Sequence, residues 1–128
     1  MVCDASVIVA MLLDSGPDGQ WATARMQGAE LAAPALVDFE VGNIVRRQEL
    51  AGTVDAGQAA QAHRDLLDLP IDRLPYESVG TRVWELRSNL SAHDASYVAV
   101  AELLEVPLVT LDRRLGRAPG LRCEVLIP

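Results

Sequence analysis

The chain has 128 residues, 50% of them apolar and 4% aromatic, and a formal net charge of −7. A single domain over residues 1–128 is therefore expected, and no apolar run approaches the ~20 residues that a membrane span requires. The acidity excludes attraction of nucleic acid by the overall field, so RNA or DNA binding would need local clusters of the 11 basic residues, all of them Arg, or a bound cation.

Apolar periodicity and turn residues predict short strands that alternate with helices along the chain. The strands are expected over residues 2–4, 30–33, 69–71, 106–111 and 124–127. The helices are expected over residues 5–13, 18–26, 35–50, 54–68, 75–89 and 95–104, followed by a helical turn over 113–116. Asp18, Thr53 and Ser91 are the expected N-caps. The near-continuous apolar run of the fourth strand is typical of a buried parallel strand, so the sequence predicts an α/β fold with a short, mainly parallel central sheet.

The two cysteines and the N-terminus bear on the cellular compartment. Cys3 and Cys123 lie near opposite ends of the chain without a Cys-x-x-Cys or His spacing, which favours buried reduced thiols over a disulfide or zinc ligands. The N-terminus has neither the basic region nor the cleavage pattern of a secretion signal. We therefore expect a cytoplasmic protein with no membrane-bound part.

Four acidic residues stand in apolar surroundings where a charge is costly. Asp4 ends the apolar N-terminal run, Asp112 follows the fourth strand, and Asp94 opens an Ala-rich helix. Glu40 shares a helix face with apolar neighbours. Because reactive groups in open parallel sheets gather outside the carboxyl ends of the strands, we expect the four side chains to converge at that edge.

Each acid also has a purely structural interpretation. Asp94 lies three residues after Ser91 and can complete a capping box, and Asp4 and Asp112 can cap the segments that follow them. Glu40 can be an exposed residue that pairs with Arg47 or Asn43 on its own helix. These interpretations explain the acids one at a time, but they leave several carboxylates crowded together.

A divalent cation would remove the repulsion within this set. A cluster of carboxylates without Cys or His ligands favours Mg²⁺ or Mn²⁺ over zinc, and neither His63 nor His93 has the spacing of a zinc site. The chemistry that follows is metal-assisted phosphodiester hydrolysis. Ser6 and Thr110, two residues from Asp4 and Asp112, are interpreted as hydroxyls that orient carboxylates, since neither has a His base nearby in the sequence.

Four segments, in the right order along nearly the whole chain, resemble the PIN domains and, within them, the VapC-type toxins of bacterial toxin–antitoxin pairs. These segments are Val2–Ser6, Glu40–Asn43, His93–Glu102 and Val109–Leu115. The resemblance implies a three-layer α/β/α fold, Mg²⁺- or Mn²⁺-dependent endoribonuclease activity, inhibition by a cognate VapB-like antitoxin and a homodimer.

The resemblance also implies roles for individual residues. It places Asp4 and Asp94 in direct contact with the metal, Asp112 as a second or water-bridged ligand, and Glu40 as a water-mediated ligand or proton acceptor. Asn43 and Thr110 correspond to polar support positions of the family.

Partners are also predicted. An antitoxin tail carrying Arg or Lys could insert among the four acids and displace the metal. Six arginines are candidates to hold RNA phosphates around the site, with an ordinary solvated charge on a helix as the alternative for each. They are Arg46, Arg47, Arg82, Arg87, Arg113 and Arg114.

Other functions fit the sequence less well. A response-regulator receiver needs a Lys that this chain lacks, and a haloacid-dehalogenase-like phosphatase needs Asp-x-Asp where Asp4 is followed by Ala5 and Ser6. The remaining alternative is a catalytically degenerate PIN-fold module that binds RNA or protein.

Overall fold

The centre of the molecule is a five-stranded sheet in which every neighbouring pair of strands is parallel. A computed structural model describes all residues from 1 to 128. The strands are β1 (Val2–Cys3), β2 (Leu31–Pro34), β3 (Ile71–Leu74), β4 (Leu108–Val109) and β5 (Val125–Leu126). Their order across the sheet is β3-β2-β1-β4-β5, which confirms the predicted short parallel sheet.

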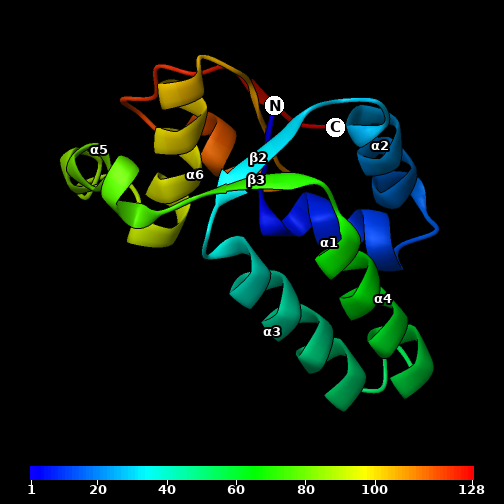
Figure 1. Cartoon of the computed structure of the whole chain (residues 1–128). Helices are drawn as coiled ribbons and strands as arrows, with labels where there is room; N and C mark the ends of the chain where they lie inside the picture. The colour runs from blue at the N-terminus through cyan, green and yellow to red at the C-terminus, as the bar shows by residue number, and fades with distance from the viewer.

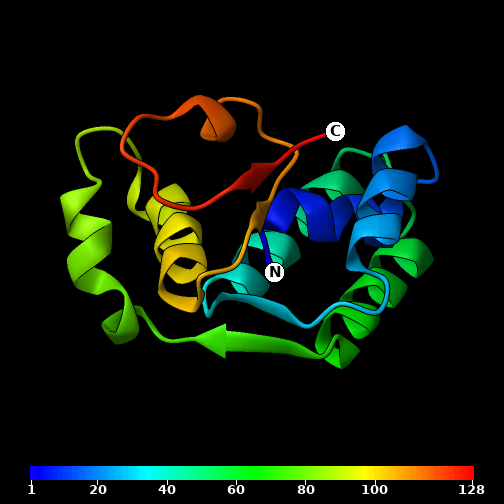
Figure 2. The same ribbon diagram turned by 90° about the horizontal axis from the view of Figure 1, so that it is seen from above.

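Helices cover both faces of this sheet. They are α1 (Ala5–Leu13), α2 (Pro17–Met26), α3 (Val37–Leu50), α4 (Ala56–Asp68), α5 (Gly80–Glu85) and α6 (Ala92–Leu104), with 3₁₀ turns η1 (Tyr76–Ser78) and η2 (Leu115–Arg117). Helices α5 and α6 lie on one side of the strands, and α1, α2 and α4 lie on the other (Figures 1 and 2). The predicted three-layer α/β/α arrangement is therefore confirmed. None of these helices combines the length and the apolar character that crossing a membrane would demand.

The order of the strands reverses at β1. Val2 pairs with Ala32 of β2 on one side and with Leu108 of β4 on the other. The chain moves outward from β1 through β2 to β3, and then returns to β4 on the other side of β1 by way of α5 and α6. A crevice opens outside the carboxyl ends of the strands at such a reversal, and in this chain it lies beyond β1 and β4.

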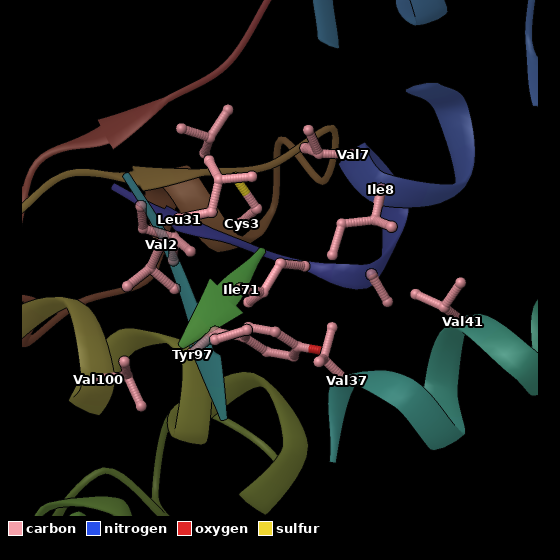
Figure 3. Packing of buried hydrophobic residues seen from close by; sticks show 14 of the residues in the cluster. Val2, Cys3, Val7, Ile8, Leu31, Val37, Val41, Ile71, Tyr97 and Val100 are labelled. Carbon is pink, nitrogen blue, oxygen red and sulfur yellow. The ribbon is translucent and has the colours of Figure 1, made fainter. Parts of the chain in front are cut away.

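The core surrounds β1, whose two residues are completely buried. Figure 3 shows Val2 and Cys3 among apolar side chains that come from α1, β2, α3 and α6. Helix α6 is buried continuously over residues 95–101, because the sheet covers one side of it and α5 packs against another. Both cysteines are free, and burial raises the pKa of the Cys3 thiol to about 12, so this thiol stays protonated.

Two predicted N-caps are wrong, and in both cases a nearby Asp accepts hydrogen bonds from the backbone amides at the start of the helix, although the N-cap position of α2 itself is Gly16. Asp55, not Thr53, caps α4, and it forms a reciprocal capping box with Gln58 at 2.8 and 2.9 Å. Asp14, not Asp18, accepts hydrogen bonds from backbone amides at the start of α2, at 2.7 and 3.3 Å. The sequence could not choose between neighbouring residues that are all good N-caps.

Helix α2 meets the end of α1 at a very close approach. A Cβ atom at Gly19 would lie 1.7 Å from the backbone oxygen of Asp14, so no other residue fits this position without moving one of the helices.

Three predicted element bounds are also wrong. The third strand covers Ile71–Leu74 instead of 69–71, since Pro70 has no amide to donate to a neighbouring strand. The helix expected over 75–89 is divided into η1 and α5, because Val79 between them has φ −130° and ψ −4°, outside the helical region. The fourth strand is two residues long, since pairing stops where the short neighbours β1 and β5 end.

Candidate active site

All four predicted acids line one cavity at the carboxyl edge of the sheet. Asp4 follows β1 and Asp112 follows the end of β4, while Glu40 and Asp94 lie in the first turns of α3 and α6. The cavity has a volume of about 390 Å³. Its other walls are formed by Ala5, Ser6, Asn43, Ile44, Arg47, His93 and Tyr97. The fold thus brings together acids that are up to 108 positions apart (112 − 4) in the sequence.

Asp4 is the most deeply buried of the four acids, with 8% of its surface exposed. Its Oδ1 accepts hydrogen bonds from the Ser6 hydroxyl at 2.5 Å and from the Val7 amide at 3.2 Å, and its Oδ2 accepts one from the Thr110 hydroxyl. Burial raises the pKa of Asp4, and these hydrogen bonds only partly oppose the rise. The carboxylate is therefore held in one orientation by neutral donors, and nothing cancels its charge.

The two hydroxyls that hold Asp4 also join the ends of β1 and β4. Thr110 accepts a hydrogen bond from the Asp112 amide at 2.9 Å, and Ser6 accepts one from the Leu111 amide at 3.1 Å. Thr110 is fully buried, so its hydroxyl has no access to water. Both hydroxyls therefore orient the Asp4 carboxylate. Asn43 lies at the cavity wall without a hydrogen bond to any of the four acids.

Glu40 is held from the opposite helix. The Tyr97 hydroxyl donates a hydrogen bond to Glu40 Oε2, and His93 Nδ1 lies 3.3 Å from Oε1. Burial first, and the Glu40 carboxylate second, raise the pKa of Tyr97 far above its ordinary value, so the phenol remains a donor. Glu40 therefore does not pair along its own helix. Tyr97 was missed by the sequence reasoning, and the signal for it is a Tyr in a buried helix, whose hydroxyl needs a partner.

Asp94 has the freest carboxylate of the set. Ser91 caps α6 and accepts a hydrogen bond from the Asp94 amide at 3.2 Å. The reciprocal bond of a capping box, from the Ser91 amide to the Asp94 side chain, is not formed. The capping-box interpretation is therefore only half right, and the carboxylate lines the cavity with no hydrogen-bond partner in the protein.

Asp112 is paired with a cation. The Arg114 guanidinium donates to both of its oxygens, at 3.1 and 2.8 Å, and the Arg114 amide donates at 2.8 Å. The hydrogen bond from the Arg114 side chain is the main reason why the pKa of Asp112 is lowered. Asp112 does cap the turn after it, as one structural interpretation predicted.

The donor chemistry of the cavity fits a hard divalent cation. Four carboxylates face it, and the one imidazole, on His93, lies at the rim with 72% of its side chain exposed. As the side chains stand, no three His, Cys, Asp or Glu residues are close enough together to hold an ion. Asp94 is free to turn, whereas Asp112 would have to exchange Arg114 for the metal.

The arginines predicted to contact RNA differ in availability. Arg82 is engaged with Glu102 and Glu85, at 2.6 and 3.1 Å, and Arg87 stacks on the Trp84 ring at 4.8 Å. Arg114 holds Asp112. Arg47 lines the cavity itself, and Arg46 lines a neighbouring groove between α3 and α4. Arg46, Arg47 and Arg113 form no ion pair in the protein.

Comparison with known proteins identifies the family of the chain. Residues 1–121 match the family model of the PIN domain. The chain is 38% identical over 130 residues to Ribonuclease VapC9 of Mycobacterium tuberculosis, covering 99% of this chain and 97% of that protein. It is 38% identical over 125 residues to Ribonuclease VapC1 of the same organism, covering 97% and 94%, and 34% identical over 125 residues to its Ribonuclease VapC12, covering 98% and 96%.

A solved structure shares the fold. The crystal structure of PAE2754 from Pyrobaculum aerophilum superimposes with a TM-score of 0.66 at 24% identity, covering 97% of this chain and 81% of that one. The match of the family model, the identity to the three ribonucleases and this likeness of fold agree with one another. The chain therefore belongs to the PIN domain family, and within it to the group that contains the VapC ribonucleases.

Proposed function

We propose that this chain is a metal-dependent endoribonuclease, the toxin of a VapBC-type toxin–antitoxin pair that acts in the cytoplasm. The observation that carries the proposal is the convergence of four carboxylates on one cavity, in a PIN domain related to ribonucleases of the VapC group. All four acids are present, which favours an enzyme over the degenerate binding module.

Asp4 and Asp94 are the proposed direct ligands of Mg²⁺ or Mn²⁺, with Asp112 as a second or water-bridged ligand. Asp4 has a fixed carboxylate and Asp94 a free one, so together they suit a cation that needs both a rigid anchor and an adaptable ligand. When bound, the cation would neutralise the scissile phosphate and make a water molecule more acidic.

The protein's own residues would align the hydrolysis. Ser6 and Thr110 keep Asp4 in place without cancelling its charge. Glu40, at the opposite wall, would orient the attacking water and accept its proton. The water oxygen forms the new bond to phosphorus, the bond to the leaving ribose oxygen breaks, and that oxygen takes up a proton from solvent.

RNA would be held by local arginines, since the overall charge of the chain repels it. Arg47 lines the cavity and Arg46 lies beside it on α3, and neither is paired with an acid. We assign phosphate contacts to these two residues and leave Arg82, which is bound to Glu102, out of the set. Neutralising Arg46 and Arg47 together should weaken RNA binding and lower its dependence on salt.

The proposed antitoxin would carry a basic or amphipathic segment. A second cavity of about 480 Å³, with six apolar residues among the 11 that line it, adjoins the acidic one and shares Ser6 and Ile44 with it. An amphipathic segment seated there would bring a basic side chain to the acids. Deleting that segment from the antitoxin should abolish inhibition, and inhibition that survives the deletion would refute this mode. A homodimer is also proposed, and sedimentation analysis of the purified chain would measure it.

The deciding experiment is cleavage of total cellular RNA by the purified chain with Mg²⁺, with Mn²⁺ or with a chelator. Asp4→Asn and Asp94→Asn are compared with Asp72→Asn, a change of the same kind at an exposed carboxylate on β3 outside the cavity. We expect discrete fragments that require the metal, persist with Asp72→Asn and vanish with the other two variants. Equal inertness of folded, antitoxin-free wild type and variants would favour the binding module instead.

A further inference from the structure

The first turns of helix α6 send three side chains to the cavity. His93, Asp94 and Tyr97 all line it, and His93 and Tyr97 are four residues apart, so they lie on the same face of the helix. Asp94 is already placed among the proposed metal ligands. The other two contact a single group, the Glu40 carboxylate on α3.

Tyr97 and His93 between them contact both oxygens of Glu40. The Tyr97 hydroxyl donates to Oε2, and His93 Nδ1 lies 3.3 Å from Oε1. The Tyr97 ring reaches from α6 toward α3 beside Val37 (Figure 3). Tyr97 is buried, with 3% of its surface exposed, whereas 72% of the His93 side chain is exposed. Tyr97 is therefore the fixed contact and His93 the mobile one.

A Glu side chain has three rotatable bonds and does not hold one position at a cavity wall unless something binds its carboxylate. Asp4 solves this problem with Ser6 and Thr110. The helix that carries Glu40 has no hydroxyl side chain that could hold its carboxylate. The buried Tyr97 hydroxyl donates this hydrogen bond from α6, across the cavity. A neutral donor fixes the carboxylate and leaves its charge in place.

We propose that Tyr97 is a positioning residue of the reaction, which fixes Glu40 where it orients the attacking water, with His93 as a weaker second contact. This inference rests on the proposed ribonuclease function. A general base contributes only when it is within hydrogen-bond reach of the proton that it takes, so a wandering Glu40 would slow the chemical step. Substrate binding should change little, because only 3% of the Tyr97 surface is exposed.

Steady-state cleavage by Tyr97→Phe, which gives kcat and KM, tests this proposal. We expect kcat to fall by about 10-fold with little change in KM, as when a buried partner of a functional side chain is removed. Tyr76→Phe is the matched control, since it removes the same hydroxyl from an exposed Tyr, and it should leave both constants unchanged. Equal melting temperatures for the two variants would show that the loss is not one of folding.

A double-mutant cycle with Glu40→Gln separates positioning from a general structural role. If Tyr97 acts through Glu40, adding Tyr97→Phe to Glu40→Gln should lower cleavage no further. A full additional loss in the double variant would overturn the proposal. So would an unchanged kcat in Tyr97→Phe while the wild type cleaves RNA, and in that case the ribonuclease function would stand. A wild type that cleaves no RNA would overturn both.

Discussion

Two groups of carboxylates in this molecule are held in opposite ways. At the cavity, Asp4 is bound by the neutral hydroxyls of Ser6 and Thr110. On α6, away from the cavity, Glu102 is bound by the Arg82 guanidinium at 2.6 and 3.2 Å, and it also accepts a backbone hydrogen bond at 2.8 Å. The first arrangement fixes a negative charge without cancelling it, and the second cancels the charge. A buried acid with neutral partners keeps a charge to which a cation could bind, whereas an acid paired with Arg joins parts of the fold.

The two groups have opposite effects of pH on stability. Burial raises the pKa of Asp4 above its ordinary 3.8, so the folded protein binds this proton more tightly than the unfolded chain does. Stability therefore falls as the pH rises from 3.8 through the raised pKa of Asp4. Burial also acts to raise the pKa of Glu102, but the hydrogen bonds from Arg82 and the Arg122 amide outweigh it and lower the value below 4.5. The stability that Glu102 contributes is present above pH 4.5 and is lost as pH falls through the lowered pKa.

Asp4→Asn should give the largest effect. RNA cleavage should fall by about 100-fold or more, because the fixed charge at the centre of the site is lost. The free energy of unfolding at neutral pH should rise by roughly 1 kcal/mol, because a poorly solvated charge is removed while the cap oxygen for the Val7 amide remains. Urea unfolding at several pH values measures this change, and the gain should shrink in acid.

Glu102→Gln is the control for that change. It also removes one negative charge, but one that is already cancelled, so it should lower stability at neutral pH and leave cleavage intact. If Asp4→Asn lowered stability as Glu102→Gln does, the contrast between the two groups of acids would be wrong.

Thr110→Val should have the next largest effect. The change keeps the shape of a fully buried side chain but leaves Asp4 Oδ2 and the Asp112 amide without their partner. We expect cleavage to fall by about 10-fold and the free energy of unfolding to fall by about 1 to 2 kcal/mol. Thr81→Val, at an exposed position of α5, should change neither quantity. Cleavage at the wild-type rate in Thr110→Val would show that Asp4 needs no neutral donor on this oxygen.

The sequence predicted the frame of the fold well and its details less well. Asp4 and Asp112 each end an apolar run, so their place at the carboxyl edge of the sheet follows from the sequence alone. The division of 75–89 into η1 and α5 could not be predicted from the sequence. The apolar pattern is helical across the whole segment, and only Val79 and Gly80 mark the interruption. The periodicity of apolar residues predicts which face of an element is buried. Tertiary contacts decide where the element ends.

The partners of the site residues were harder to predict than the residues themselves. Tyr97 and Glu40 are 57 positions apart, and Arg82 and Glu102 are 20 apart on different helices. Both pairings depend on how α6 is placed against its neighbours, which no periodicity encodes. For this reason Tyr97 was missed, and Arg82 was named as a candidate RNA contact without its ion pair to Glu102 being foreseen.

Arg82→Met should lower the stability of the fold around Glu102 and leave the cavity unaffected. The guanidinium joins α5 to Glu102 of α6 and donates to the Gly120 carbonyl at 2.8 Å, so it ties the segment before β5 to both helices. Met keeps most of the apolar stem, so the expected loss in the free energy of unfolding is about 1 to 2 kcal/mol. Cleavage per folded molecule should stay at the wild-type level. A selective loss of RNA binding in Arg82→Met would instead return this arginine to the set of phosphate contacts.

Arg114→Ala should have the smallest effect, and it tests the acid that belongs to neither group. Asp112 faces the cavity like Asp4 but is paired with an arginine like Glu102. Arg114 is 89% exposed, so its removal should leave stability unchanged, and the pKa of Asp112 should return toward its ordinary value. If Asp112 contacts the metal, the freed carboxylate should bind Mn²⁺ a few-fold more tightly, as measured by calorimetric titration. Arg113→Ala, which removes an adjacent exposed arginine without an ion pair, should leave the affinity for Mn²⁺ unchanged. Equal affinities in the wild type and both variants would mean that Asp112 serves only to cap its turn, and the site would then contain three functional acids.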